Sequence, residues 1–170
     1  RTPEGHALHR VAERRATTIF RREAADPAAA DPDHPAVTEA LARRGRGEPL
    51  PEAIRLEMQA RLGADLGGVR IHTDDLADGA ARALCARAFT VGEDVFFATG
   101  AFSPREAGGR ELLAHELAHV LQGQQGRLDM GSGGTRVSRA DEAIERDADV
   151  IAERALTCPP RAVAAPPVSA

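Results

Sequence analysis

Apolar residues recur at intervals of three and four along six stretches of the chain, and this spacing predicts six helices. The expected helices cover residues 6–25, 36–44, 51–62, 74–86, 110–122 and 138–156. Shorter runs rich in β-branched and aromatic residues predict strands. The expected strands cover residues 69–72, 89–91 and 95–98, and the last two are joined by a turn at residues 92–94. Helices mixed with a few short strands indicate an α+β fold with a small sheet.

Proline-rich and glycine-rich stretches separate these elements. Residues 26–35 contain three prolines and are expected to form a linker, and the glycine-rich residues 123–137 are expected to form a loop. We therefore divide the chain into four parts. They are an amphipathic N-terminal helix (1–25), a linker with a short helix (26–46), a core domain (47–157) and a disordered Pro/Ala-rich tail (158–170). With 170 residues, the chain is long enough to form one domain with a proper core.

The expected helix at residues 110–122 is apolar on nearly all sides, which is typical of a buried helix. It carries His115, Glu116 and His119, and the two histidines project from one face, one turn apart. Buried His and Glu side chains are costly unless they are paired or bind a metal ion. The spacing therefore predicts that His115 and His119 bind one Zn²⁺, with Glu116 beside them as a general base.

A third ligand is needed, and a downstream helix offers the best candidate. The metzincin class would require Gly at position 122 and His at 125, and Gln122 and Gln125 exclude it. On the helix at 138–156, Glu145 lies beside the core-facing stripe and could complete the zinc site. Asp149, one turn later, could accept a hydrogen bond from the second ring nitrogen of a ligand histidine.

Three other residues are candidates for a role at this metal site. Glu142 lies one turn before Glu145 on the same side and is the rival ligand. Asp147 points about 200° away from Glu145 on the helix and is not expected to bind the metal. His72 could be an accessory ligand or could stabilise a reaction intermediate. We favour a structural role for His72, as a hydrogen-bonding residue whose partner is Thr73 or Asp74.

Two family resemblances rest on these motifs. The pattern of Glu145, Ala148 and Asp149 resembles the Glu-x-x-Ala-Asp element of gluzincin peptidases. A larger part of the chain resembles the extracellular contractile injection system (eCIS) core domain. The matching stretches are residues 47–51 (GEPLP), 62–65 (LGAD), 69–74 (VRIHTD), 88–92 (AFTVG) and 112–122 (LLAHELAHVLQ). The resemblance implies a bacterial protein that accompanies effectors or toxins of phage-tail-like injection machines, and a metallopeptidase activity.

Composition excludes several other classes. Hydrophobic residues make up 42% of the chain, which argues against global disorder. The net charge is −4 with both signs interspersed, so we expect no nucleic-acid partner. No apolar stretch is long enough for a membrane span, and the N-terminus does not resemble a signal peptide. We expect synthesis in the cytoplasm, with an injection system as the route of export. Cys85 is expected to be a buried helical residue, and no disulfide with Cys158 is predicted.

These observations predict a compact α+β, zincin-like domain in which a later helix closes the site beside the His-Glu-x-x-His helix. The predicted function is hydrolysis of polypeptides, including segments of the parent chain, by water that zinc activates and Glu116 deprotonates. If the strand at 95–98 is the open edge of the sheet, it could pair with an extended substrate. The alternative is a zinc-stabilised module without turnover that packages an effector or binds an injection-system partner. The presence of Glu116 beside the ligands favours the enzyme.

Overall fold

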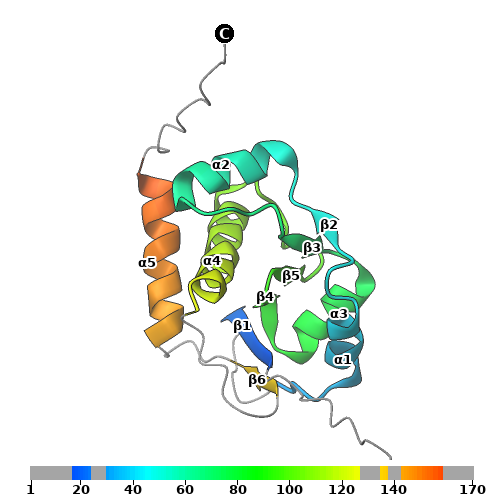
Figure 1. Ribbon diagram of the computed structural model, residues 1–170. Coiled ribbons are helices and arrows are strands. Elements are labelled where there is room, and N and C mark those ends of the chain that lie inside the picture. The colour runs from blue at the N-terminus through cyan, green and yellow to red at the C-terminus, as the bar shows by residue number, and fades with distance from the viewer. Residues whose placement is uncertain (1–16, 24–29, 127–134, 138–142, 159–170) are drawn as a thin grey trace, which may run out of the picture.

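The fold is a mixed α+β arrangement built on one sheet (Figure 1). The computed structural model describes residues 17–23, 30–126, 135–137 and 143–158. The described strands form a six-stranded sheet in the order β2-β3-β5-β4-β1-β6. Their bounds are β1 Thr17–Glu23, β2 Glu48–Pro49, β3 Arg70–His72, β4 Ala86–Val91, β5 Asp94–Phe97 and β6 Thr135–Val137. The β3/β5 and β1/β6 pairs are parallel, and the other three pairs are antiparallel.

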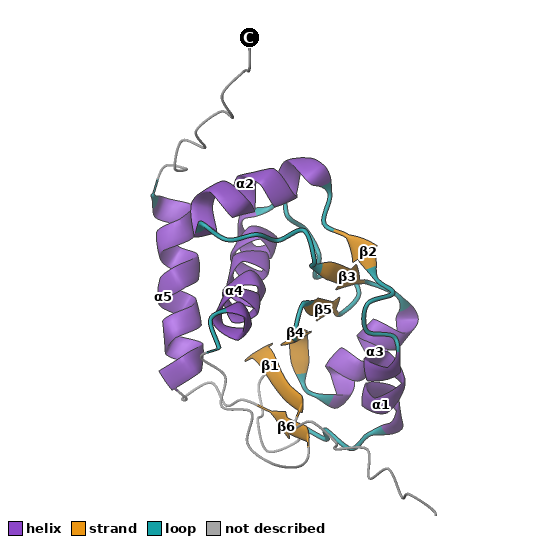
Figure 2. Ribbon diagram, viewed as in Figure 1, coloured by secondary structure: helices purple, strands orange, loops and turns teal. Residues whose placement is uncertain are grey.

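Helices cover both faces of the sheet (Figure 2). Their bounds are α1 Pro35–Ala42, α2 Glu52–Leu62, α3 Asp75–Ala83, α4 Ala107–Gln124 and α5 Ala143–Thr157. Helices α1 and α3 lie on one side, while α4 lies on the other side with α2 and α5 next to it. Successive residues of β4 contribute to different cores. Ala88 packs in the core that contains Leu113 and Leu117 of α4, and Phe89 packs in the core shared with α1 and α3.

The N-terminal helix predicted for residues 6–25 is wrong over residues 17–23. This segment is β1, which pairs antiparallel with β4 and parallel with β6. The local sequence Thr-Thr-Ile-Phe is rich in β-branched and aromatic residues, which fit a sheet better than a helix. Pairing with two distant segments of the chain therefore prevailed over a helical periodicity. Residues 1–16 and 24–25 of the predicted helix lie outside the described part.

Strand β5 is internal to the sheet, so residues 95–98 do not form the open edge that substrate pairing would require. It pairs with β3 on one side and with β4 on the other. Its backbone groups are therefore already engaged on both sides. The β4 strand is flanked in turn by β1, and the described sheet ends at β2 and β6.

Helix α4 is longer than predicted at both ends. It begins at Ala107 and includes Gly108 and Gly109, two residues that weaken helices in isolation. A Cβ at position 109 would lie 2.2 Å from the carbonyl oxygen of Ser103, so the close approach of the preceding turn requires glycine there. At the other end, α4 continues to Gln124, inside the predicted loop. Residues 135–137, also inside the predicted loop, form strand β6. The loop residues 127–134 and the predicted tail from residue 159 lie outside the described part.

Helix α3 ends at Ala83, earlier than the predicted end at residue 86. Cys85 follows it with a φ of 50°, a left-handed conformation that stops the helix, and β4 begins at the next residue. Cys85 is therefore partly exposed and not a buried helical residue, and both Cys85 and Cys158 are free thiols. The remaining predicted elements form close to their expected positions, except that residues 138–142 before α5 are outside the described part.

Candidate metal centre

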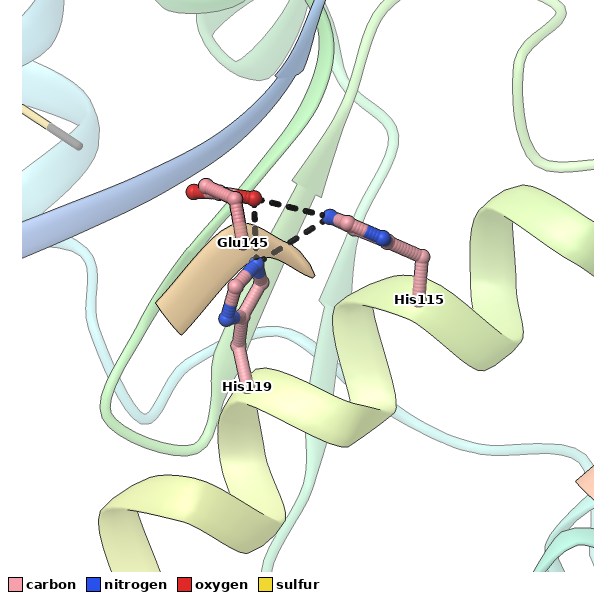
Figure 3. A group of neighbouring side chains, drawn as sticks. All are labelled: His115, His119 and Glu145. Carbon is pink, nitrogen blue, oxygen red and sulfur yellow. Dashed lines mark hydrogen bonds and ion pairs between the residues drawn. The ribbon is translucent and has the colours of Figure 1, made fainter. Parts of the chain in front are cut away.

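Three buried side chains from two helices converge on one point (Figure 3). His115 and His119 project from adjacent turns of α4, and Glu145 reaches them from the first turn of α5. Glu145 Oε2 lies 3.1 Å from His115 Nε2 and 3.0 Å from His119 Nε2, and the two Nε2 atoms are 3.1 Å apart. Each of the three residues is at most 3% exposed. The structure therefore brings together the two predicted histidine ligands and Glu145.

The spacing of these atoms fits a metal ion. In a tetrahedral zinc site with bonds of about 2.0–2.1 Å, the ligand atoms lie roughly 3.3 Å from one another. The observed separations of 3.0–3.1 Å are slightly smaller. Two imidazole nitrogens and one carboxylate oxygen are also a suitable donor set for zinc and for several other first-row metals. The group could thus hold a metal ion, and its geometry does not select one element.

The second ring nitrogen of each histidine faces an oxygen atom. His115 Nδ1 lies 2.9 Å from Asp149 Oδ1, and His119 Nδ1 lies 2.8 Å from Gln122 Oε1. An ionised carboxylate and an amide oxygen only accept hydrogen bonds, so both Nδ1 atoms carry the proton. In a neutral imidazole the other nitrogen then presents a lone pair. Where both imidazoles are neutral, two Nε2 lone pairs and the Glu145 carboxylate meet, which is costly unless a cation lies among them.

Glu116 is fully buried on the same helix and is held by the sheet. Thr90 of β4 donates a hydrogen bond from its Oγ1 to Glu116 Oε2 at 2.6 Å, and the same hydroxyl lies 3.3 Å from the Glu116 carbonyl oxygen. Glu116 is not one of the three residues that converge at the candidate metal centre. Thr90 was missed by the sequence analysis. The only signal in the sequence was a polar residue inside the apolar stretch 88–92.

His72 belongs to a different cluster. Its Nε2 lies 2.8 Å from Asp94 Oδ1, and its ring stacks on Phe96 with centroids 4.2 Å apart. The partner of His72 is therefore Asp94 of the neighbouring strand and not Thr73 or Asp74, as the sequence had suggested. Asp74 instead caps α3 by accepting a hydrogen bond from the Ala77 N–H. Among the described residues, the group that could hold a metal ion does not include His72.

Two other acids on and before α5, Glu142 and Asp147, were considered as ligands in the sequence. Glu142, the rival ligand, lies outside the described residues. Asp147 is not in the metal-binding group; its Oδ2 accepts a hydrogen bond from Gln122 Nε2 at 3.1 Å. Gln122 was used in the sequence analysis only to exclude one peptidase class. A buried polar residue three positions after His119 in an otherwise apolar run is the signal that could have identified its contact with that histidine.

An ion pair links the N-terminal half of α4 to α2. Glu57 of α2 accepts hydrogen bonds from Arg110 of α4 and from Arg61 of its own helix. Burial raises the pKa of the Glu57 carboxyl, but the two guanidinium groups outweigh this effect and lower its pKa below the usual value. Arg61 also donates to the carbonyl oxygen of Ala155 on α5 at 2.9 Å. These contacts link α2 to α4 and α5, the two helices that carry the candidate metal ligands.

Comparison with known families covers less than half of the chain. Residues 49–127 match the family model of the eCIS core domain. The matched segment contains His115, Glu116 and His119 but neither β1 nor Glu145 of α5. The match supports an association with contractile injection systems. No curated protein and no solved structure matches the chain. Among the described helices, none has both the length and the apolar character needed to cross a membrane.

Proposed function

We propose that this protein is a zinc-dependent metalloendopeptidase associated with a bacterial contractile injection system. One observation carries the proposal. Two histidine nitrogens and a carboxylate oxygen converge within 3.1 Å of one another, and a buried glutamate follows the first histidine. That combination supplies a metal site and a proton acceptor on adjacent positions of one helix. The family match supports the association with an injection system, and it extends over the whole of α4.

His115, His119 and Glu145 would hold the ion. Zinc bound there would act as a Lewis acid that polarises a peptide carbonyl and lowers the pKa of water. The remaining requirement is a base that takes a proton from the attacking water and returns it to the leaving amine. We assign both transfers to Glu116, because it lies next to His115 on α4 and a carboxylate can act first as base and then as acid.

Thr90 would position this base. Its hydroxyl donates to Oε2 of Glu116 and thereby restricts the rotation of the carboxylate. The overall reaction is hydrolysis of a peptide bond. The amide C–N bond breaks, the carbonyl carbon gains a hydroxyl group and the amine nitrogen gains a proton. The substrate class is a polypeptide, with segments of the parent chain among the candidates.

A second function is favoured by the burial of the centre. Each of the three converging residues is at most 3% exposed, and closed sites are typical of structural zinc. In this alternative the ion ties α5 to α4, and the domain serves as a packaging or interaction module for an injected effector. This module would need the three ligands but would have no use for the carboxylate of Glu116.

Replacement of Glu116 by glutamine separates the two functions. Glu116→Gln keeps the size of the side chain and removes the proton acceptor, so cleavage should fall by roughly 10²–10⁴-fold while bound zinc is retained. Glu111→Gln, at an exposed glutamate of the same helix, is the matched control and should behave like wild type. The assay compares an unstructured protein, a peptide library and the chain itself as substrates. If wild-type protein retains zinc but cuts none of them, the packaging module is the better description.

A further inference from the structure

Gln122 is a fully buried polar side chain with hydrogen-bond partners on both α4 and α5. Its Oε1 lies 2.8 Å from Nδ1 of His119. Its Nε2 lies 3.1 Å from the carbonyl oxygen of Ile144 and 3.1 Å from Oδ2 of Asp147. Glu145 lies in sequence between these last two residues. The amide group of Gln122 therefore contacts His119 directly. It also contacts α5 on both sides of Glu145 in the sequence.

The orientation of this amide follows from the chemistry of its neighbours. The Ile144 carbonyl and the Asp147 carboxylate accept hydrogen bonds but cannot donate them, so the amide NH₂ must face α5. The amide oxygen then faces His119, and an amide oxygen only accepts. The hydrogen bond therefore requires a proton on His119 Nδ1, which leaves Nε2 of the neutral ring as a lone pair directed at Glu145.

We propose that Gln122 is a positioning residue for the candidate metal centre, and that it organises two of the three ligands at once. It fixes His119 as the Nδ1–H tautomer, and it anchors the turn of α5 that presents Glu145. The role of Gln122 at a metal centre rests on the proposed function. The Nδ1–H tautomer that Gln122 imposes on His119 does not require a metal ion.

The two histidines are held in different ways. Asp149, whose side chain is 55% exposed, lies 2.9 Å from His115 Nδ1. Gln122 is 0% exposed and neutral, and it forms hydrogen bonds with residues of both α4 and α5. Water can replace an exposed carboxylate as a hydrogen-bond acceptor, but it cannot readily replace a buried amide. Loss of Gln122 should therefore disturb the centre more than loss of Asp149.

A glutamate at position 122 could not perform both tasks. It would keep an acceptor for His119 Nδ1 but would place a carboxylate oxygen against the acceptors Ile144 O and Asp147 Oδ2. A leucine of similar size would remove both contacts. Comparison of Gln122→Glu with Gln122→Leu therefore separates the contact to the histidine from the contact to α5.

The test is nitrogen NMR of the imidazole rings in the metal-free, ¹⁵N-labelled full chain, at a mildly alkaline pH where imidazoles are neutral. In wild type, His119 should be protonated on Nδ1. In Gln122→Leu the ring should shift toward the Nε2–H form, and the affinity for zinc should fall by about 10–100-fold. Gln122→Glu should retain the Nδ1–H form but unfold at lower denaturant concentration than wild type. Asp147→Ala is the matched control: it removes one α5 contact and should leave the tautomer unchanged.

Two outcomes would overturn the assignment of Gln122 as the residue that fixes and positions His119. One is an Nε2–H tautomer of His119 in wild type, which can be observed even if Gln122→Leu does not fold. The other is a folded Gln122→Leu that keeps both the Nδ1–H tautomer and wild-type zinc affinity. Absence of cleavage by the wild type would count against the proposed peptidase but not against this role. Absence of zinc binding by the wild type, with the Nδ1–H tautomer present, would remove the metal centre and leave Gln122 as a purely structural link.

Discussion

Thr90 and Glu116 lie 26 residues apart in the sequence and are joined by a hydrogen bond of 2.6 Å in the interior of the protein. The hydroxyl of Thr90, on the middle of the sheet, donates to a carboxylate on α4 that is fully buried. A carboxylate in such surroundings is costly unless its oxygens accept hydrogen bonds. The contact therefore stabilises the fold and orients the proposed base at the same time.

Replacement of Thr90 by valine should expose both roles. Valine has nearly the same shape but cannot donate, so Glu116 loses the hydrogen bond from Thr90 and the free energy of unfolding should fall by about 1–3 kcal/mol. Denaturant unfolding of the metal-free protein measures this change. Thr73→Val, at an exposed threonine, is the control and should have little effect. Equal stability of Thr90→Val and wild type would show that Thr90 does not support Glu116.

Metal content should depend on the two histidines of α4. Purified wild type should carry about one equivalent of zinc, and either His115→Ala or His119→Ala should lose most of it, because each removes a ligand. Elemental analysis after dialysis measures the content, with His34→Ala at an exposed histidine as control. Full zinc occupancy in the double variant His115→Ala/His119→Ala would rule out this site.

The third ligand can be tested on α5. Glu145→Ala should weaken zinc binding by at least about 10–100-fold, because the carboxylate closest to both Nε2 atoms is lost. Glu153→Ala, an exposed glutamate of the same helix, should bind zinc as wild type does. Competition with a chromophoric chelator gives the affinities. If Glu142→Ala weakens binding and Glu145→Ala does not, the rival residue is the ligand.

Asp149→Asn should have a smaller effect than Glu145→Ala. The asparagine oxygen can still accept from His115 Nδ1, but the negative charge that strengthens this hydrogen bond is lost. We expect a zinc affinity between those of wild type and Glu145→Ala, measured in the same competition assay. An affinity as low as that of Glu145→Ala would instead indicate that Asp149 binds the metal itself.

The loss of stability between neutral and acid pH should depend on Glu57. Its pKa is lowered in the folded protein because hydrogen bonds from Arg110 and Arg61 outweigh the opposing effect of burial. A group with a depressed pKa stabilises the fold above its unfolded-state pKa, and the contribution disappears as the pH falls through the folded-state pKa. Glu57→Gln should therefore be less stable than wild type at neutral pH, and the difference should shrink in acid. A difference that is constant between neutral pH and pH 3 would exclude this linkage.

Much of α4 and its histidine pair could be predicted because the relevant interactions are local. The helical repeat alone places His115 and His119 on one face, and the apolar residues around them indicate burial. The helical repeat of apolar residues likewise predicted α5, with Glu145 beside its buried stripe. A helical repeat depends only on residues within one or two turns of one another, and their spacing can be read directly from the sequence.

Only the tertiary structure decided which residues meet. The packing of α5 on α4 brings Glu145 to the histidines and Asp149 to His115. Pairing with β4 and β6 makes residues 17–23 a strand, although their periodicity predicted a helix. Three hydrogen bonds join side chains that the sequence marks only as polar. They pair Asp94 with His72, Thr90 with Glu116, and Gln122 with His119. Such contacts depend on the relative placement of separate elements, and residue spacing carries no direct information about that placement.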